Sequence, residues 1–221
     1  MSCAGRAVVF DMDGLMLDTE PSYKYAWQRA ARDLGYELED SLYDTLIGRC
    51  EADSEAELTR AFGPRFSIPE FRRRWSEHWR TRVEERGVPT KDGLLELLSL
   101  LEERGTPLAV ATSSDSCRAG FSLRSAGLEH RIPVIVAGDQ VAKGKPAPDI
   151  FVEAARRLGV EPHACVALED SDAGVLSAVA AGMRALMIPD LQKPSEAALR
   201  SALRVLPSLR DATPVLLSLL A

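Results

Sequence analysis

The stretch that decides the fold is Ala7-Val8-Val9-Phe10-Asp11-Met12-Asp13-Gly14. It begins with a short apolar run, which is typical of a strand buried on both faces of a parallel sheet. The run stops at two aspartates one residue apart, Asp11 and Asp13, and Gly14 follows. Open α/β proteins bind ligands at the carboxyl ends of their strands, so the aspartates are candidate site residues. An Asp-x-Asp-Gly pattern also begins ordinary turns, and the rest of the chain must separate the two interpretations.

Strand and helix patterns alternate along the second part of the chain. The predicted strands cover residues 107–112, 133–137, 165–168 and 184–188. Helical patterns precede or separate them at residues 94–101, 116–126, 149–158 and 173–181. Repeats of this kind predict a parallel sheet with helices on both faces. The predicted fold class is therefore α/β, with a doubly wound, mainly parallel, Rossmann-like sheet.

Residues 19–87 interrupt this alternation because they contain only helical patterns. The clearest is an apolar stripe with four-residue spacing, formed by Phe71, Trp75, Trp79 and Val83. Such spacing places the side chains on one face of a helix. We therefore expect a core domain formed by residues 1–18 and 88–221, and a small inserted all-α cap domain formed by residues 19–87.

The composition excludes several classes of function. The 221 residues are 46% hydrophobic and 27% charged, as in ordinary globular proteins. A net charge of −6 argues against nucleic acid as a partner. No apolar stretch reaches membrane-spanning length, and the four cysteines form no Cys-x-x-Cys pair that would indicate zinc. The sequence before the first strand leaves no room for a signal peptide, so the expected location is cytoplasmic.

Polar residues follow three of the predicted strands and occupy one loop. In chain order they are Asp11 and Asp13, Thr112-Ser113-Ser114, Lys145 in its loop, and Glu169-Asp170. Carboxylates beside hydroxyls, backbone amides and one ammonium are suited to bind Mg²⁺ together with a phosphoryl group. Each member alone has a structural explanation, either a helix N-cap or a surface lysine. Their joint arrangement at one edge of the sheet favours a site.

These residues resemble the motifs of the haloacid dehalogenase superfamily, and more closely its β-phosphoglucomutase-like branch of phosphatases with a helical cap. The matching motifs are Phe10-Asp11-Met12-Asp13-Gly14, Ala111-Thr112-Ser113, Gly144-Lys145-Pro146-Ala147-Pro148-Asp149-Ile150-Phe151 and Leu168-Glu169-Asp170-Ser171. Further matches lie at Asp18-Thr19-Glu20-Pro21 and Gly48-Arg49. The resemblance covers essentially the whole chain.

The resemblance implies a catalytic role for the acidic residues. Asp11 would be the nucleophile that forms an aspartyl-phosphate. Asp13 would be the general acid that protonates the leaving group and then the base that activates water. The implied cofactor is Mg²⁺, held by Asp11, Asp170 and the backbone carbonyl of Asp13. Glu169 would influence the ion indirectly, either by contacting its ligands or through a water.

The resemblance also implies contacts with the substrate. Thr112, Ser113 and Lys145 would bind the phosphoryl group, and Thr112 and Lys145 would also stabilise the charge that develops on it. Arg49 is either a contact for a second phosphate or a sugar, or a solvated cap residue. The implied partner is a small phosphorylated molecule. The sequence indicates no nucleic acid or membrane partner and leaves the oligomeric state open, with a monomer as one possibility.

The implied activity is that of a Mg²⁺-dependent phosphomonoester hydrolase acting on a small metabolite such as a sugar phosphate. Asp13 favours phosphate chemistry, because dehalogenases of the family lack this aspartate. A hexose-phosphate mutase is the alternative enzyme, although β-phosphoglucomutases carry a histidine where Tyr23 aligns. A phospho-signalling receiver module is an alternative of another class. The cap insertion, Asp13 and Glu169-Asp170 argue against it.

Overall fold

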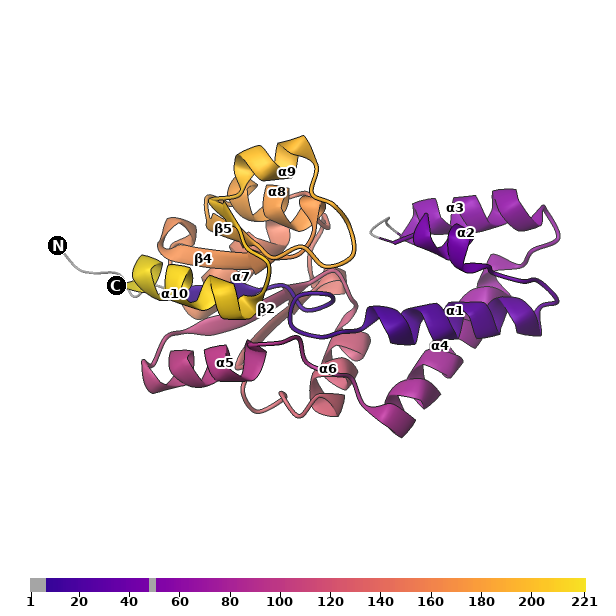
Figure 1. Ribbon diagram of the computed structural model, residues 1–221, viewed down its shortest axis with the longest axis horizontal. Helices are drawn as coiled ribbons and strands as arrows, with labels where there is room; N and C mark the ends of the chain where they lie inside the picture. The colour runs from indigo at the N-terminus through magenta and orange to yellow at the C-terminus, as the bar shows by residue number, and fades with distance from the viewer. Residues whose placement is uncertain (1–6, 48–50) are drawn as a thin grey trace. The chain divides into compact units, whose positions relative to one another are not determined.

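The computed structural model describes residues 7–47 and 51–221 (Figure 1). The chain divides into two compact units. One, which we call the core unit, comprises Met1–Asp18 and Pro89–Ala221, and the other, the helical unit, comprises Thr19–Val88. None of the helices in the described ranges is both long enough and apolar enough to span a membrane.

The core unit contains a six-stranded sheet whose paired neighbours all run parallel. Its strands are β1 (Ala7–Phe10), β2 (Leu108–Thr112), β3 (Val134–Ala137), β4 (Cys165–Glu169), β5 (Arg184–Met187) and β6 (Arg204–Val205). Their spatial order is β3-β2-β1-β4-β5-β6. This is the strand order of a doubly wound Rossmann-like sheet, and it confirms the predicted fold class.

The strand order places a switch point between β1 and β4. The chain builds outward from β1 through β2 to β3, then returns to β4 on the other side of β1. Loops that diverge at such a point leave a crevice at the carboxyl ends of the strands. Phe10 pairs with Leu168, and the N–H of Asp11 donates to the Leu168 carbonyl at 2.9 Å. The acidic residues that follow β1 and β4 are therefore neighbours.

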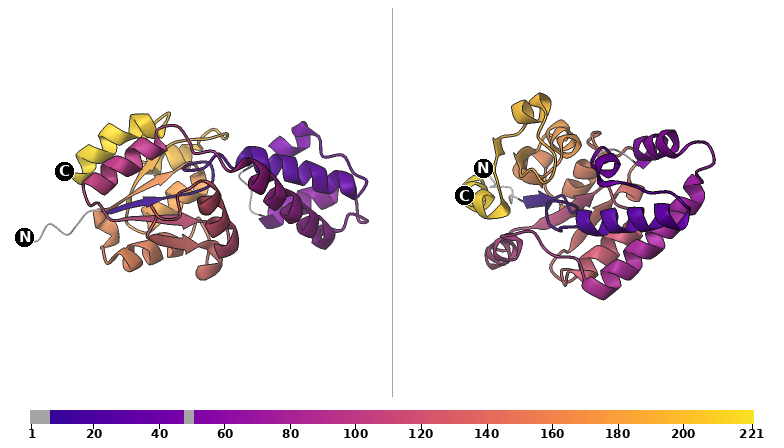
Figure 2. Two further views of the ribbon diagram at one scale, coloured as in Figure 1. Left: turned by 90° about the horizontal axis from the view of Figure 1, so that it is seen from below. Right: turned by 45° about the vertical axis from the view of Figure 1, so that its right-hand side comes forward.

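Helices cover both faces of the sheet (Figure 2). Those of the core unit are α5 (Leu94–Glu103), α6 (Ser116–Ser125), α7 (Asp149–Leu158), α8 (Asp172–Ala180), α9 (Glu196–Ser201) and α10 (Leu209–Leu220). Two 3₁₀ turns, η1 (Gly138–Gln140) and η2 (Pro162–Ala164), complete the set. α7 packs on β1, β2 and β3, α8 packs on β4 and β5, and α5 packs against α10. Ala7 and Val9 share a buried cluster with Phe151 of α7, so the alternate side chains of β1 face the opposite layer.

Side-chain caps begin α6 and α8, the two helices that directly follow polar residues of the predicted site. The Asp115 carboxylate accepts a hydrogen bond from the N–H of Arg118 at 2.8 Å, at the start of α6. The Ser171 hydroxyl accepts one from the N–H of Gly174 at 3.1 Å, at the start of α8. Capping therefore explains Asp115 and Ser171. It does not explain the polar residues immediately before them.

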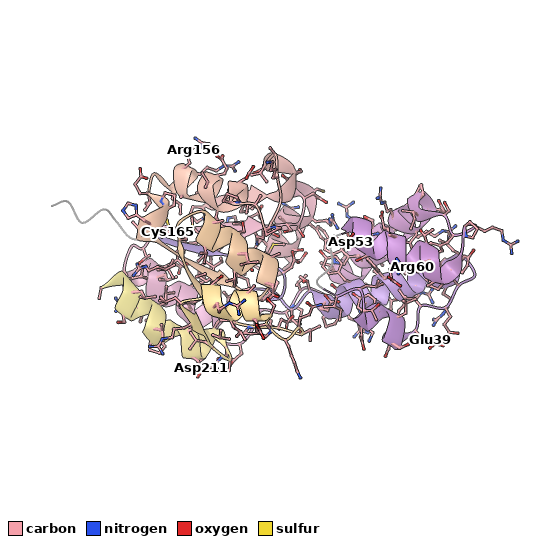
Figure 3. The ribbon with its side chains drawn as sticks, turned by 90° about the horizontal axis from the view of Figure 1, so that it is seen from above. Glu39, Asp53, Arg60, Arg156, Cys165 and Asp211 are labelled. Carbon is pink, nitrogen blue, oxygen red and sulfur yellow. The ribbon has the colours of Figure 1, made fainter. Side chains whose placement is uncertain are left out.

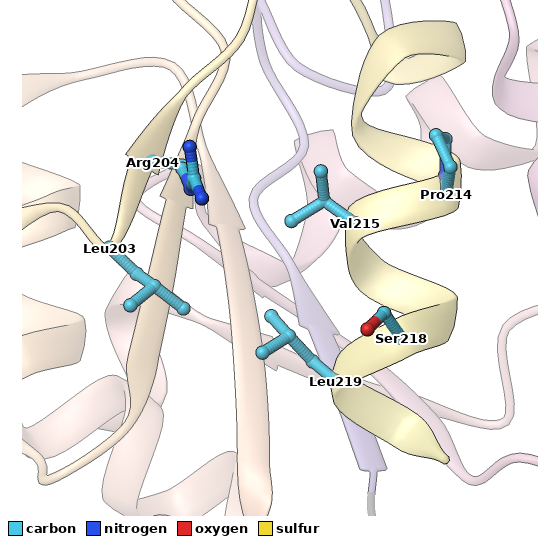
Figure 4. Close-up of a pocket in the computed structure, with 6 residues that line it drawn as sticks. All are labelled: Leu203, Arg204, Pro214, Val215, Ser218 and Leu219. Carbon is cyan, nitrogen blue, oxygen red and sulfur yellow. The ribbon is translucent and has the colours of Figure 1, made fainter.

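The sequence analysis predicts no element after residue 188, and here the structure adds α9, β6 and α10. β6 is only two residues long, too short to show an alternating pattern. Ser195 caps α9 and Ser208 caps α10. Each hydroxyl accepts a hydrogen bond from the backbone N–H of the residue three positions later in the chain. A hollow of about 440 Å³ lies between β6 and α10 (Figure 4), lined by Leu203, Arg204, Pro214, Val215, Ser218 and Leu219. None of these lining residues belongs to the predicted site.

The helical unit consists of α1 (Glu20–Asp33), α2 (Asp40–Asp44), α3 (Glu51–Phe62) and α4 (Ile68–Arg86). α1 and α4 pack together through aromatic rings. Tyr23 stacks on Trp79 at 5.7 Å, and Trp27 meets Phe71 edge-on at 5.4 Å between ring centroids. α2 is only five residues long, because the chain after Asp44 continues in tighter turns with backbone hydrogen bonds to the third preceding residue.

Charged side chains of both units lie mainly at their surfaces (Figure 3). Arg60 of α3 and Arg156 of α7 are exposed and pair with glutamates three residues earlier. By contrast, Cys165 at the start of β4 is fully buried within the core unit. Burial raises the pKa of its thiol to about 11 and makes it unreactive at neutral pH.

Candidate active site

Asp11 is the first residue after β1, and it is buried, with only 6% of its surface exposed. Its Oδ1 accepts a hydrogen bond from the ammonium of Lys145 at 2.5 Å. Burial is the largest influence on the carboxyl group and, together with the charge of Glu169, raises the pKa of Asp11 to about 8 against the opposing effect of Lys145. The ionised form of Asp11 therefore depends on nearby positive charge.

Lys145 supplies that charge from the loop before α7. Its Nζ donates to Asp11 Oδ1 at 2.5 Å, to Glu169 Oε1 at 2.6 Å and to the Ala111 carbonyl at 2.9 Å. It also lies 5.2 Å from the centre of the Phe151 ring. Burial disfavours the ammonium, but the carboxylates of Asp11 and Glu169 outweigh it and hold the pKa of Lys145 above its usual value. All three N–H bonds have acceptors, so a phosphoryl oxygen must share or replace one of them.

Glu169 is the last residue of β4, and its side chain is fully buried. Oε1 receives the Lys145 ammonium, and Oε2 accepts from the Ser171 hydroxyl at 3.2 Å. Gly174 makes room for this carboxylate: a Cβ there would lie 1.9 Å from its carboxyl carbon. No pattern in the sequence singles out Gly174, because its role depends on where the Glu169 side chain points.

Asp13 is held by hydroxyl groups rather than by cations. Its Oδ2 accepts hydrogen bonds from the Ser114 hydroxyl at 2.8 Å and the Thr112 hydroxyl at 3.3 Å. Its Oδ1 is buried and has no hydrogen-bond partner within residues 7–47 and 51–221. A buried oxygen without a partner is costly unless a ligand completes it. Asp13 therefore offers one fixed oxygen and one open oxygen, as proton transfer to a ligand requires.

The three hydroxyl residues after β2 separate into two groups. Thr112 and Ser114 are buried, and both hydroxyls reach Asp13. Ser113, between them, is exposed. The alternation of β2 thus continues past its end and brings the Ser114 hydroxyl to Asp13, a contact for a residue of the predicted polar cluster that had no assigned role of its own. The contact of Ser113 with a phosphoryl group remains a prediction.

Three carboxylates can hold a metal ion in this crevice. Asp11, Glu169 and Asp170 each have a ligand oxygen within 4.8 Å of the others. Burial, followed by the charges of Asp11 and Glu169, raises the pKa of Asp170 well above its ordinary value. Asp170 forms no ion pair with a lysine or arginine in the described residues. A partly buried carboxylate beside two buried ones, with no ion pair in the described residues, fits a hard divalent ion with oxygen ligands.

Gly14 lets Asp170 approach the end of β1. Its backbone has a φ of +87°, a conformation that favours glycine. A Cβ at this position would lie 2.4 Å from Asp170 Oδ2, closer than any side chain allows. The Asp-x-Asp-Gly motif thus provides two acidic side chains and the space for a third.

Two residues considered in the sequence analysis do not join this cluster. Arg49 lies outside the described residues. Tyr23 belongs to the helical unit, where it is half-buried and stacked on Trp79.

Comparison with known proteins identifies the family. Residues 8–188 match the model of haloacid dehalogenase-like hydrolases. The chain belongs to this family. It is 36% identical over 177 residues to the phosphorylated carbohydrates phosphatase of Thermotoga maritima, covering 80% of this chain and 82% of that protein. It is 35% identical over 182 residues to a fructose-1-phosphate phosphatase of Escherichia coli, covering 81% and 94%.

A solved structure supports both the family and the fold. The chain superposes on CbbY from Rhodobacter sphaeroides, crystallised in complex with phosphate, with a TM-score of 0.80 and 28% identity. The match covers 94% of this chain and 96% of that one. The family resemblance stated from the motifs is thereby confirmed, and the chain is a hydrolase whose relatives include named phosphatases.

Proposed function

We propose that this protein is a Mg²⁺-dependent phosphatase of small phosphorylated sugars that works through an aspartyl-phosphate at Asp11. One arrangement of side chains carries the proposal. The buried Asp11 contacts Lys145 and lies beside the Asp170 carboxylate, which forms no ion pair in the described residues. In the same range, one buried oxygen of Asp13 has no hydrogen-bond partner. The two relatives compared above are named as phosphatases of phosphorylated carbohydrates and of fructose 1-phosphate. Family membership favours a hydrolase over a phospho-signalling receiver.

The reaction divides into two displacements at phosphorus. In the first, a carboxylate oxygen of Asp11 forms a bond to phosphorus, the bond from phosphorus to the sugar oxygen breaks, and Asp13 gives its proton to that oxygen. In the second, Asp13 takes a proton from water, the water oxygen bonds to phosphorus, and the Asp11 carboxylate leaves. Asp13 ends each cycle protonated, as it began, and inorganic phosphate departs.

The surrounding side chains prepare the two aspartates for these roles. Ser114 and Thr112 hold one oxygen of Asp13 and leave the other free for the substrate. Lys145 orients Asp11, offsets its charge and lies where the charge of a transferring phosphoryl group would develop. The buried Glu169 fixes the position of Lys145. Thr112 and the backbone of Ser113 are the further proposed phosphoryl contacts.

The residues that would hold Mg²⁺ are Asp11, Asp170 and the backbone carbonyl of Asp13. When bound, the ion offsets the repulsion between the substrate and the attacking carboxylate. Glu169 is committed to Lys145 and Ser171, which supports a role behind the ligands rather than among them.

The core unit and the helical unit would have different functional roles. We assign catalysis to the core unit and selection of the substrate to the helical unit as a cap, with Arg49 as a proposed contact. In other enzymes, closure of such an element excludes water and commits the substrate. A cytoplasmic location and a monomeric state remain predictions.

Phosphate release from a panel of sugar phosphates tests the proposal. With Mg²⁺ the wild-type protein should release phosphate from at least one sugar phosphate, and EDTA should stop the reaction. Asp11→Asn should show no release, because an amide cannot replace the nucleophilic carboxylate. Full activity in EDTA, or in Asp11→Asn, would contradict the proposal.

A hexose-phosphate mutase is the competing enzyme, and one assay separates the two. Tyr23 occupies the aligned position of the mutase histidine and packs on Trp79, which favours the phosphatase. Glucose 1-phosphate with a trace of glucose 1,6-bisphosphate should give free phosphate. Accumulation of glucose 6-phosphate would instead identify a mutase.

A further inference from the structure

Asp190 lies in the loop after β5, close to the candidate metal site, and its role is unassigned. Its side chain is only 15% exposed. One oxygen, Oδ1, accepts a hydrogen bond from the ammonium of Lys91 at 2.6 Å. The other, Oδ2, has no hydrogen bond to any residue in the described part of the chain. One oxygen of Asp190 is thus anchored, and the second is available.

The available oxygen faces the same space as Asp170. A Cβ on Gly14 would lie 2.4 Å from Asp170 Oδ2 and 3.2 Å from Asp190 Oδ2. The two carboxylates therefore approach each other beside the bare Cα of Gly14. Asp190 is not one of the three residues whose ligand oxygens lie within 4.8 Å of one another. It lies next to that group without belonging to it.

Lys91 fixes Asp190 in this place. The N–H of Lys91 donates to the Met16 carbonyl at 2.9 Å, so its backbone is tied to the loop that follows β1. Its ammonium lies 3.8 Å from Asp18, a weaker and more exposed contact than the one with Asp190. The positive charge offsets the repulsion between two neighbouring carboxylates, which burial would otherwise strengthen.

We infer that Asp190 is a positioning residue for the metal, accepting a hydrogen bond from water on the cation held by Asp11 and Asp170, with Lys91 as its anchor. This inference rests on the proposed function. Mg²⁺ in proteins commonly keeps several of its waters. Groups that hydrogen-bond to such ligands orient them, and their removal typically weakens metal binding or activity by about 10–100-fold.

Calorimetric titration of the full chain with Mg²⁺ alone, without substrate, tests this role. Asp190→Asn keeps the shape of the side chain, removes its charge, and should raise the Mg²⁺ Kd by about tenfold or more. Asp18→Asn is the matched control, because it also removes a partner of Lys91 but is not among the nearest neighbours of a Cβ at Gly14, which belong to Asp170 and Asp190, and its Kd should be unchanged. Saturating Mg²⁺ should restore kcat in Asp190→Asn, because Asp190 does not touch the substrate.

Lys91→Met gives a second, independent test. Removal of a positive charge would by itself tighten the binding of a cation, whereas loss of the anchor of Asp190 should weaken it. Wild-type affinity in Asp190→Asn, or tighter binding in Lys91→Met, would overturn the inference. If the wild-type protein neither binds Mg²⁺ nor releases phosphate, the proposed function itself fails. If it does both while Asp190→Asn binds like wild type, only the role of Asp190 fails.

Discussion

In the core unit the charges at the end of β1 are few, buried and joined through one lysine, whereas α4 carries many charges, several of them exposed and paired with residues of the same helix. Lys145 is 4% exposed and contacts two carboxylates from different strands. Arg73 is 54% exposed and pairs with Glu70 and Glu77 of its own helix. The first arrangement shifts pKa values at a crevice and is costly to disturb, while the second is screened by water. Burial, rather than the number of charges, therefore marks the candidate active site.

The largest effect should come from breaking the buried network at its centre. Lys145→Met leaves Asp11 and Glu169 buried without their cation, which typically costs about 3 kcal/mol or more. Turnover should also fall by about 10²–10³-fold, because a charge that faces the transferring group is lost. Urea unfolding in EDTA measures the first effect, and phosphate release at saturating Mg²⁺ measures the second. Wild-type values in both assays would show that the network is not essential.

A smaller steric change should disturb the same network indirectly. In Gly174→Ala the added Cβ would overlap the Glu169 carboxylate, which must move and take Lys145 with it. Overpacking of this kind costs about 1–3 kcal/mol. Gly120→Ala in α6 is the control, since its new Cβ would meet only Arg124 Nη1 at 3.4 Å. We expect lower kcat and stability in Gly174→Ala, with activity unchanged in Gly120→Ala. Equal behaviour of the two variants would contradict the assigned role of Gly174.

The pH dependence of Mg²⁺ binding tests the electrostatics of the site. The pKa of the metal-free Asp11 carboxyl is raised to about 8 and that of Asp170 is also raised, so both groups hold a proton more readily than free carboxyls and must be ionised when they bind the ion. The Mg²⁺ affinity should therefore fall by at least about tenfold per pH unit below 8, and binding at pH 7 should release at least one proton. Calorimetry in two buffers of different ionisation enthalpy measures that proton. The same affinity at pH 6 and pH 8 would show that Asp11 is already ionised.

The smallest effect should come from changing an exposed charge of α4. Arg73→Met removes two ion pairs on α4, but both are exposed and local. We expect no measurable change in stability or kcat, because surface pairs of this kind contribute little. A large loss of activity with unchanged stability would instead indicate that this face of α4 meets the substrate.

The sheet and its acidic strand ends could be predicted because local patterns carry them. β1 is a short apolar run that stops at Asp11, and β4 is a similar run that ends in Glu169 and Asp170. Parallel strands bring such ends to one edge wherever they occur in the chain. Lys145 joins the predicted cluster through its loop before the helix at residues 149–158, whereas its contacts with Asp11 and Glu169 depend on how that loop folds.

The remaining parts of the site depend on geometry that no local pattern contains. Ser114, rather than Ser113, reaches Asp13 because the alternation of β2 continues beyond its last residue. Gly174 and Asp190 gain their roles from the side chains that they face, Glu169 and Asp170 respectively. The capping serines of α9 and α10 were a usable signal for the missed C-terminal elements. β6 had none, because two residues cannot show a period.

Mass spectrometry of an acid-quenched reaction tests the central claim most directly. During turnover of a sugar phosphate with Mg²⁺, the peptide that contains Asp11 should gain the mass of one phosphoryl group. Hydroxylamine should remove that group, because it cleaves acyl phosphates, and Asp11→Asn should never acquire it. Phosphate release without modification of this peptide, or modification of another residue, would contradict Asp11 as the nucleophile.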